Sequence, residues 1–154
     1  MRVCRPFAAV VAVLPLAGCF LWGSHDSTPA PIEVALQASD QLNPDEQGAS
    51  LPTMVLLYQL KSAAKIETAD FADVYRRPKE SLGEDLLQAD EVEITPGQSQ
   101  TKTLARDKAA KALAVVAVVR RPAGPGWRSI VQLGPPDERV RLTFVLEGYK
   151  IGRR

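Results

Sequence analysis

The side chains that could carry chemistry are few and lie close to the start of the chain. Among 154 residues there are two cysteines, Cys4 and Cys19, and one histidine, His25. A nucleophilic mechanism needs a base positioned beside the nucleophile, and a zinc site needs several cysteine or histidine ligands. The sequence after His25 contains neither residue type. It therefore predicts a protein that is not an enzyme and holds no metal.

Carboxylates cluster at two places, Glu84–Asp85 and the run Asp90, Glu91 and Glu93. A pair of carboxylates can act as general acid and general base. These acids, however, lie beside turn residues or alternate with apolar residues, where acidic side chains are usually solvated. We expect them to be surface charge.

Cys19 differs from these residues because it ends an ordered pattern. Residues 1–5 are basic, residues 7–16 are apolar, and Ala17 and Gly18 are small. About 20 apolar residues are needed to span a bilayer, whereas a run of about ten is typical of a signal-peptide core. The sequence LAGC resembles the lipobox of bacterial lipoproteins, in which the cysteine thiol takes a diacylglycerol. The alternative is a buried N-terminal helix with an incidental cysteine.

The resemblance implies cleavage between Gly18 and Cys19, so that residues 1–18 are a lipoprotein signal peptide. The lipid on Cys19, with fatty acids such as palmitate, would be the only cofactor. Several acyl chains, at about 0.8 kcal/mol per buried methylene, are enough for stable membrane anchoring. Phe20 stands where such lipoproteins carry aspartate when they stay at the inner membrane, which implies an outer-membrane protein facing the periplasm.

The composition after the cleavage site fits one near-neutral domain. Loss of Arg2 and Arg5 takes the formal net charge from +1 to about −1, which gives no reason to expect nucleic acid as a partner. No disulfide can form once Cys4 is removed and Cys19 is lipidated. Residues 19–31 are rich in Gly, Ser, Thr and Pro and predict a flexible tether. Residues 32–154 predict the folded domain.

Alternating apolar and polar residues in this domain indicate about seven strands. The clearest are a first strand from Ile32, a two-faced apolar strand at Thr53–Leu60 and a last strand around Val140–Glu147; the others lie near residues 86–94, 98–105, 111–120 and 127–133. One short helix is predicted at Ala69–Tyr75. Regular spacing with turn residues between strands favours an all-β, two-sheet β-sandwich with a short inserted helix.

The order of LAGC, LNPDEQG, TMVLLYQLK, ADF, LGEDLL and EVEITPG resembles the outer-membrane lipoproteins of type VI secretion systems, the TssJ/SciN/VasD family. The resemblance covers residues 36–128. It implies a transthyretin-like sandwich without catalytic activity or small-molecule substrate. It also implies docking to the periplasmic region of the inner-membrane TssM/IcmF-like protein, with TssL in the same complex. The alternative is a periplasm-facing lipoprotein that binds a small or hydrophobic ligand in an apolar cavity of the sandwich.

In that family the loop between the first two strands carries much of the partner contact, which corresponds here to residues 41–51. Its candidate residues are an apolar anchor, polar contacts and backbone-shaping residues: Leu42, Asn43, Pro44, Asp45, Gln47, Gly48 and Leu51. Pro44 and Gly48 would fix the backbone and lower the ordering cost on binding. The alternative is a plain surface turn with Leu42 packed back on the sandwich.

Other motif residues are assigned to the fold. Phe71, Leu82, Leu86 and Leu87 are expected in the core, and Gly83 is expected at a positive φ. The basic end of the chain, residues 148–154, matches no feature of the family and is expected to be frayed.

Overall fold

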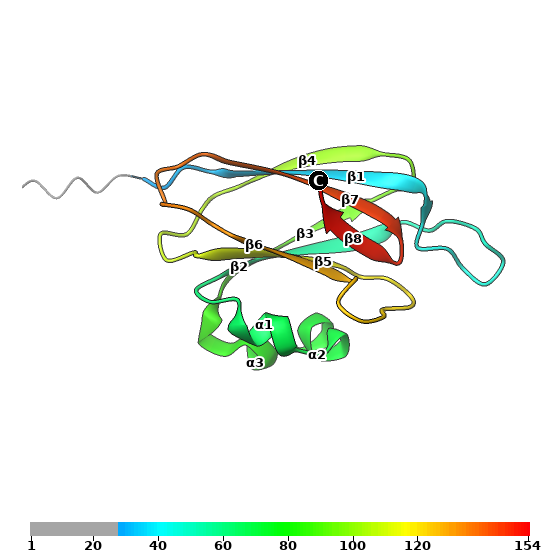
Figure 1. Cartoon of the computed structure of the whole chain (residues 1–154), viewed down its shortest axis with the longest axis horizontal. Helices are drawn as coiled ribbons and strands as arrows, with labels where there is room; N and C mark the ends of the chain where they lie inside the picture. The colour runs from blue at the N-terminus through cyan, green and yellow to red at the C-terminus, as the bar shows by residue number, and fades with distance from the viewer. Residues whose placement is uncertain (1–27) are drawn as a thin grey trace, which may run out of the picture.

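The computed structural model describes residues 28–154, which form two four-stranded β-sheets packed face to face (Figure 1). The strand order is β4-β1-β7-β8 in one sheet and β3-β2-β5-β6 in the other. The first sheet comprises β1 (Ile32–Leu42), β4 (Ser99–Leu104), β7 (Val140–Gly148) and β8 (Lys150–Arg153), and the second comprises β2 (Thr53–Leu60), β3 (Leu86–Ile94), β5 (Ala112–Ala117) and β6 (Arg128–Gln132). The predicted two-sheet sandwich is confirmed.

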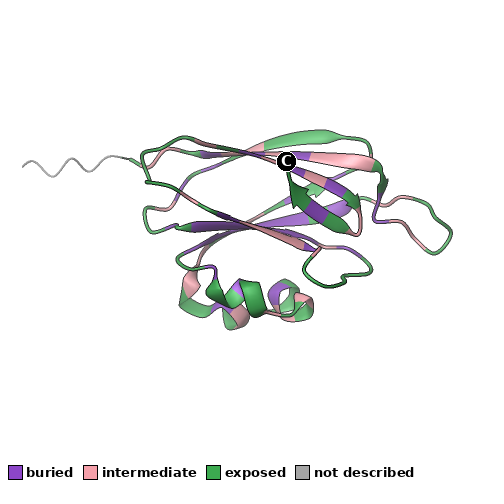
Figure 2. Cartoon of the chain, viewed as in Figure 1, coloured by how far each residue is buried: buried purple, intermediate pink, exposed green. Residues whose placement is uncertain are grey.

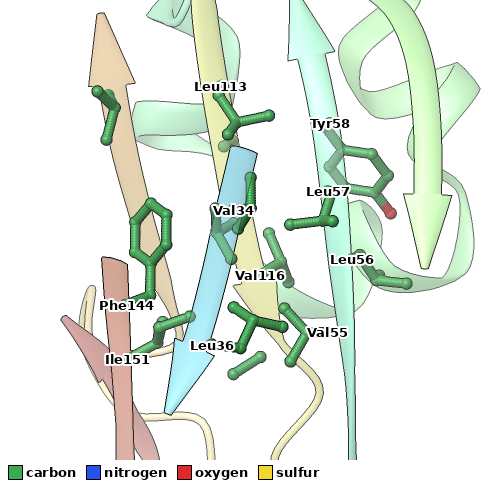
Figure 3. Packing of buried hydrophobic residues seen from close by; sticks show 14 of the residues in the cluster. Val34, Leu36, Val55, Leu56, Leu57, Tyr58, Leu113, Val116, Phe144 and Ile151 are labelled. Atoms are coloured by element: carbon green, nitrogen blue, oxygen red, sulfur yellow. The ribbon is translucent and has the colours of Figure 1, made fainter. Parts of the chain in front are cut away.

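The core between the sheets follows from the two-residue period of the strands. In β1 the side chains of Val34 and Leu36 are buried, and in the parallel neighbour β7 their register partners Leu142 and Phe144 are buried too. Side chains from both sheets meet in the space between them (Figure 3). Burying each large aliphatic or aromatic side chain stabilises the fold by about 1.5–3 kcal/mol.

The second sheet is covered on its outer face as well, by a helical layer between β2 and β3 (Figure 1). The layer consists of α1 (Ala64–Thr68), α2 (Phe71–Arg76), α3 (Pro78–Leu82) and the 3-10 turn Gly83–Asp85. Each helix contributes one buried side chain, Ile66, Val74 and Leu82 respectively. Because this sheet is covered on both faces, β2 and β5 are buried along nearly their whole length (Figure 2).

The single helix predicted at Ala69–Tyr75 was therefore partly wrong. Ala69 has an extended backbone and ends α1, so the middle helix begins only at Phe71. Tyr58 of β2 packs beneath this layer, and its hydroxyl donates to the carbonyl of Val74 at 3.2 Å. Burial, with a smaller contribution from the nearby charge of Glu91, raises the pKa of Tyr58 to about 12. None of the helices in residues 28–154 has the length and apolar character to cross a bilayer.

Of the residues that LGEDLL and ADF were expected to place in the core, one is fully buried and the others are half-buried. Leu82 is fully buried, and Gly83 has φ of +58°. Phe71 and Leu86 are half-buried and pack against the core. Leu87 is also half-buried. The prediction of core positions is thus strongest for Leu82.

The expectation of a frayed C-terminal end was wrong. Residues Lys150–Arg153 form β8, which pairs antiparallel with β7 and places Ile151 opposite Leu146. Gly148 adopts φ of +54°, which permits the tight turn between the two strands. Ile151 is 5% exposed and belongs to the core. The basic residues around Ile151 concealed this single buried position in the sequence.

Candidate functional site

The loop between β1 and β2, residues 43–52, projects from one end of the sandwich (Figure 1). The chain enters the described structure at the other end, where β1 begins. We call the projecting end the tip: it comprises the β1–β2 loop, the β5–β6 connection at 118–127 and the turn between β7 and β8. We call the other end the tether end: it comprises residues 28–31, the β4–β5 connection at 105–111 and the β6–β7 connection at 133–139.

The base of the β1–β2 loop is fixed by Asn43. Its backbone has φ of 45°, a left-handed conformation that asparagine tolerates better than most residues. Its N–H donates to the carbonyl of Gly148 at 2.7 Å, and its side-chain Oδ1 accepts from the N–H of Arg120 at 2.9 Å. Asn43 therefore ties the base of the loop to the β7–β8 turn through its backbone and to the β5–β6 connection through its side chain.

The outer part of the loop is a turn organised by Asp45. Its Oδ1 accepts hydrogen bonds from the N–H groups of Gln47 and Ala49, at 2.9 and 2.8 Å. The N–H of Gly48, which has φ of +84°, donates to the carbonyl of Asp45 at 3.2 Å. Because the carboxylate of Asp45 already accepts these backbone bonds, it shapes the loop and leaves Glu46 and Gln47 pointing to solvent as exposed residues.

Tyr149 and Arg120 contact the loop from the side, and Arg121 contacts Tyr149. The hydroxyl of Tyr149 donates to the carbonyl of Pro44 at 2.7 Å. The guanidinium of Arg120 lies 3.9 Å from a carboxylate oxygen of Glu46. The guanidinium of Arg121 lies 5.9 Å from the centre of the Tyr149 ring, within range of a cation–π interaction. Contacts within the domain therefore hold the loop in place without a partner.

The structure separates the sequence-predicted loop residues into supports and exposed residues. Leu42 is fully buried as the last residue of β1, so its side chain packs in the core, as the alternative interpretation held, and cannot be an exposed apolar anchor. Asn43 is buried, and Pro44, Asp45 and Leu51 are partly buried. Gln47 and Gly48 are exposed.

Sequence analysis missed three residues of the tip, Glu46, Arg120 and Tyr149. Glu46 lies inside the motif LNPDEQG and could have been included with its neighbours. Arg120 is 77 positions from Asn43, and Tyr149 is 105 positions from Pro44, the loop residues that they contact. No local pattern in one sequence links positions that far apart.

The predicted cleavage and lipidation residues, Gly18 and Cys19, lie outside the described residues. Within residues 28–154, no cluster of three or more potential metal ligands is found. The acidic clusters of the sequence take part in ion pairs: Asp85 lies 3.3 Å from Lys65, and Asp90 lies 3.2 Å from Lys102. Their carboxylates act there as ordinary surface charges.

The fold and the tip define a two-sheet β-sandwich domain with a helical cover and a single projecting, internally braced loop. The chain belongs to the family described as Type VI secretion lipoprotein, VasD, EvfM, TssJ, whose model matches residues 30–148. The resemblance drawn from the sequence motifs is confirmed. No curated protein matches the chain significantly.

Solved structures agree with this assignment. The T6SS lipoprotein TssJ1 from Pseudomonas aeruginosa is 27% identical, with a TM-score of 0.73 over 82% of this chain and 97% of that chain. Serratia marcescens Lip, described as a membrane-bound component of the type VI secretion system, is 22% identical, with a TM-score of 0.73 over 83% and 99% of the two chains. A structure described as the T6SS protein TssM C-terminal domain from EAEC is 21% identical, with a TM-score of 0.71 over 80% and 97%.

Proposed function

We propose that this chain is an outer-membrane lipoprotein that docks, through its tip, the periplasmic domain of a TssM/IcmF-like inner-membrane protein. The position of the β1–β2 loop carries the proposal. The loop lies at the far end of the sandwich from the start of β1 (Figure 1). A lipid on Cys19 would hold the tether end toward the outer membrane, and the tip would then face the inner membrane.

The dimensions suit this role. A tether from Cys19 to Pro31 can extend about 40 Å at 3.3–3.6 Å per residue. The 11 residues of β1 add about 35 Å along the sandwich at about 3.3 Å each. The tip can therefore reach on the order of 75 Å from the outer-membrane surface. That distance lets it meet a partner rooted in the other membrane.

The internal bracing of the loop supports docking by a preformed surface. The side chains of Asn43 and Asp45 accept backbone hydrogen bonds and the hydroxyl of Tyr149 donates one, which orders the loop before any partner arrives. A loop that is already ordered loses less conformational entropy on binding. The exposed residues at its outer turn, Glu46 to Ala49, would make the contacts.

In this proposal the protein acts mechanically and catalyses no reaction. The acyl chains hold one end in the outer membrane, and the tip holds the TssM/IcmF-like protein, which shares a complex with TssL. Family membership and the match to the structure described as the TssM C-terminal domain support a partner of this type.

The anchor is tested by Cys19→Ser. Without the thiol no lipid can be attached, so we expect the protein in the soluble periplasmic fraction and type VI secretion to stop. Fractionation and a secretion assay measure the two effects. Normal secretion with the unanchored variant would contradict the anchoring role.

The docking surface is tested by Glu46→Lys/Gln47→Lys in residues 19–154 that carry Cys19→Ser. Both side chains are exposed, so we expect an unchanged unfolding midpoint and at least tenfold weaker binding of the purified periplasmic domain of the TssM/IcmF-like protein in calorimetry. Deleting all of residues 41–51 is less suitable, because it removes the buried Leu42.

The matched control is Gln132→Lys/Asp137→Lys, two exposed positions at and beside the tether end. It introduces the same residue type at a comparable pair of positions. We expect its binding to equal that of the unaltered chain. Equal weakening by both variants would argue against the tip as the docking surface.

A further inference from the structure

An open groove lies beside the β1–β2 loop, along the β7–β8 hairpin. Its volume is about 810 Å³, and its walls come from β7, β8 and the β5–β6 connection. Gln41, the last residue but one of β1, also lines it, so the groove is continuous with the base of the loop. This size is in the range of sites that hold small ligands or short peptide segments.

The groove is strongly basic. Among the lining side chains within residues 28–154, Arg121, Lys150, Arg153 and Arg154 are cationic, and Glu147 is the one acidic side chain. All four cations are exposed. A concave surface lined by one sign of charge raises the local concentration of ligands of the opposite sign.

Within the described residues, the groove cations outnumber the single carboxylate beside them, that of Glu147. Elsewhere on the domain, cations such as Lys65, Lys102 and Arg141 lie within 3.2–3.3 Å of a carboxylate. In the part of the chain that the structure describes, none of the four groove cations forms an ion pair. Arg121 has only the ring of Tyr149 as a partner. Four cations beside one carboxylate, that of Glu147, leave the groove with a net positive charge, which an acidic ligand would offset.

The strand at the rim of the groove suits an extended ligand. β8 is an edge strand of its sheet. The N–H of Arg154 donates to Thr143 of β7, whereas the N–H of Ile151 points away from β7 and donates to the carbonyl of Gly126. Alternate residues of a strand point their N–H groups to the same side, so the N–H of Arg153 also lies on the outer edge. Because the N–H of Ile151 already bonds to Gly126, the N–H of Arg153 is the outer donor of β8 that an extended segment can use.

The floor of the groove is open at Gly152. A Cβ added there would meet no heavy atom within 4 Å, in contrast to Gly126, where a Cβ would lie 3.0 Å from the side chain of Lys150. Main chain from a ligand can therefore approach Gly152 closely.

We infer that this groove binds an extended acidic peptide segment of the periplasmic partner, next to the contact made by the β1–β2 loop. The inference rests on the docking function proposed above. Glutamate and aspartate side chains of the segment would contact Arg121, Arg153 and Arg154, and its backbone would lie beside Gly152 and accept a hydrogen bond from the N–H of Arg153. The groove thereby adds a charge-dependent contact to the docking surface.

The test is the variant Arg153→Glu/Arg154→Glu in residues 19–154 with Cys19→Ser. Calorimetry with the purified periplasmic domain of the TssM/IcmF-like protein is done at low and high salt. Because exposed ion pairs weaken as salt screens them, we expect about tenfold weaker binding at low salt and less than about twofold at 0.5 M. The control Lys111→Glu/Arg139→Glu makes the same charge change at exposed positions of the tether end, and its affinity should be unchanged.

A second variant, Gly152→Leu, tests the groove without changing charge. Its side chain would fill the floor, and we expect about tenfold weaker binding at both salt concentrations with an unchanged unfolding midpoint. Affinities for the partner that equal those of the unaltered chain in both groove variants would overturn the inference.

The outcomes separate this inference from the docking function. Weaker binding in the loop variant Glu46→Lys/Gln47→Lys, with both groove variants unaffected, overturns the groove and leaves docking intact. If the unaltered chain does not bind the partner domain, docking itself fails. Phosphatidylglycerol vesicles are the second probe. If Arg153→Glu/Arg154→Glu weakens vesicle binding but leaves partner binding unaltered, the groove binds lipid and the inference of a peptide ligand is overturned.

Discussion

The two ends of the sandwich use different means to hold their loops. At the tether end, Arg106 is 6% exposed and donates to the carbonyls of Ala110, Gly134 and Pro135, which ties the β4–β5 connection to the β6–β7 connection. At the tip, Asn43 ties the base of the β1–β2 loop, while the outer turn of that loop remains in solvent.

The two ends differ in which polar groups are buried and which face solvent. The Arg106 guanidinium is buried among carbonyls, with only its Nε lacking a partner within residues 28–154. The tip holds its supports beneath the loop and presents Glu46, Gln47 and the cations of the groove outward. Both ends expose loop residues, but only the tip combines a braced loop with a groove beside it, which suits contact with a partner.

The largest effect is expected at the tether end, from Arg106→Ala. Three buried or partly buried carbonyls would lose their donor, which lowers the free energy of unfolding by about 3 kcal/mol. Urea unfolding of residues 19–154 with Cys19→Ser measures the loss, and partner affinity at full folding should stay within twofold. Arg139→Ala, an exposed position of the same connection, should change stability by less than about 0.5 kcal/mol. Equal losses of stability in the two variants would contradict the claim that Arg106 holds the β4–β5 and β6–β7 connections together.

A smaller effect is expected at the tip, from Asn43→Ala. The variant loses the hydrogen bond from Arg120 and places alanine at φ of 45°, together about 2 kcal/mol of the free energy of unfolding. Because the loop becomes less ordered, partner affinity should fall about fivefold.

Asn43→Gly separates the two causes. Glycine adopts the positive φ freely but cannot accept the hydrogen bond, so about half of the stability loss should remain. Affinity that is unchanged in both variants would mean that bracing of the loop does not matter for docking. Unfolding curves and calorimetry supply both quantities.

The features that were predicted from the sequence are those that depend on residues close together along the chain. The alternation at Ile32, Val34 and Leu36 predicted a half-buried strand, and the apolar run Thr53–Leu60 predicted a central one, because these patterns depend only on neighbours along the chain. The proline, glycine and polar residues of LNPDEQG predicted a loop for the same reason, although Gln41 and Leu42 belong to β1. Positive φ at Gly83 followed from local turn chemistry.

The rest depends on contacts between distant positions. Leu42 was a candidate apolar anchor, with packing on the sandwich as the alternative. The register of β1 shifts between Ala38 and Leu42, so alternation along the strand could not decide between them, and the structure buries Leu42. Tyr149, Arg120 and the groove cations meet the loop only because β7, β8 and β5 end beside it. One helix was predicted, whereas the helical layer contains three helices and a 3-10 turn within the described residues. Helices this short contain too few residues to show a periodic pattern.

A modest effect is expected from Tyr149→Phe. The phenyl ring keeps its packing, but the carbonyl of Pro44 loses the hydroxyl donor at 2.7 Å, which lowers the free energy of unfolding by about 1 kcal/mol. Partner affinity should fall two- to threefold, about the change expected when one of the loop's supports is lost. Tyr75→Phe is the control, since Tyr75 is 41% exposed and lies in the helical layer. A larger effect from Tyr75→Phe would contradict the bracing role of Tyr149.

The smallest effects on stability are expected from Glu46→Gln at the tip and Glu33→Gln near the tether end. This pair of variants gives the most direct comparison of the two ends. Glu46 lies 3.9 Å from Arg120 at the tip, and Glu33 lies 3.3 Å from Arg141 near the tether end; both pairs are exposed. Exposed ion pairs contribute about 0–1 kcal/mol, so both variants should unfold within about 0.5 kcal/mol of the unaltered chain. Glu46→Gln should nevertheless change partner affinity and its dependence on salt, whereas Glu33→Gln should change neither. Since the two variants remove the same charge at nearly the same cost to folding, a difference in binding would come from contact at the tip, and equal binding would mean that Glu46 does not touch the partner.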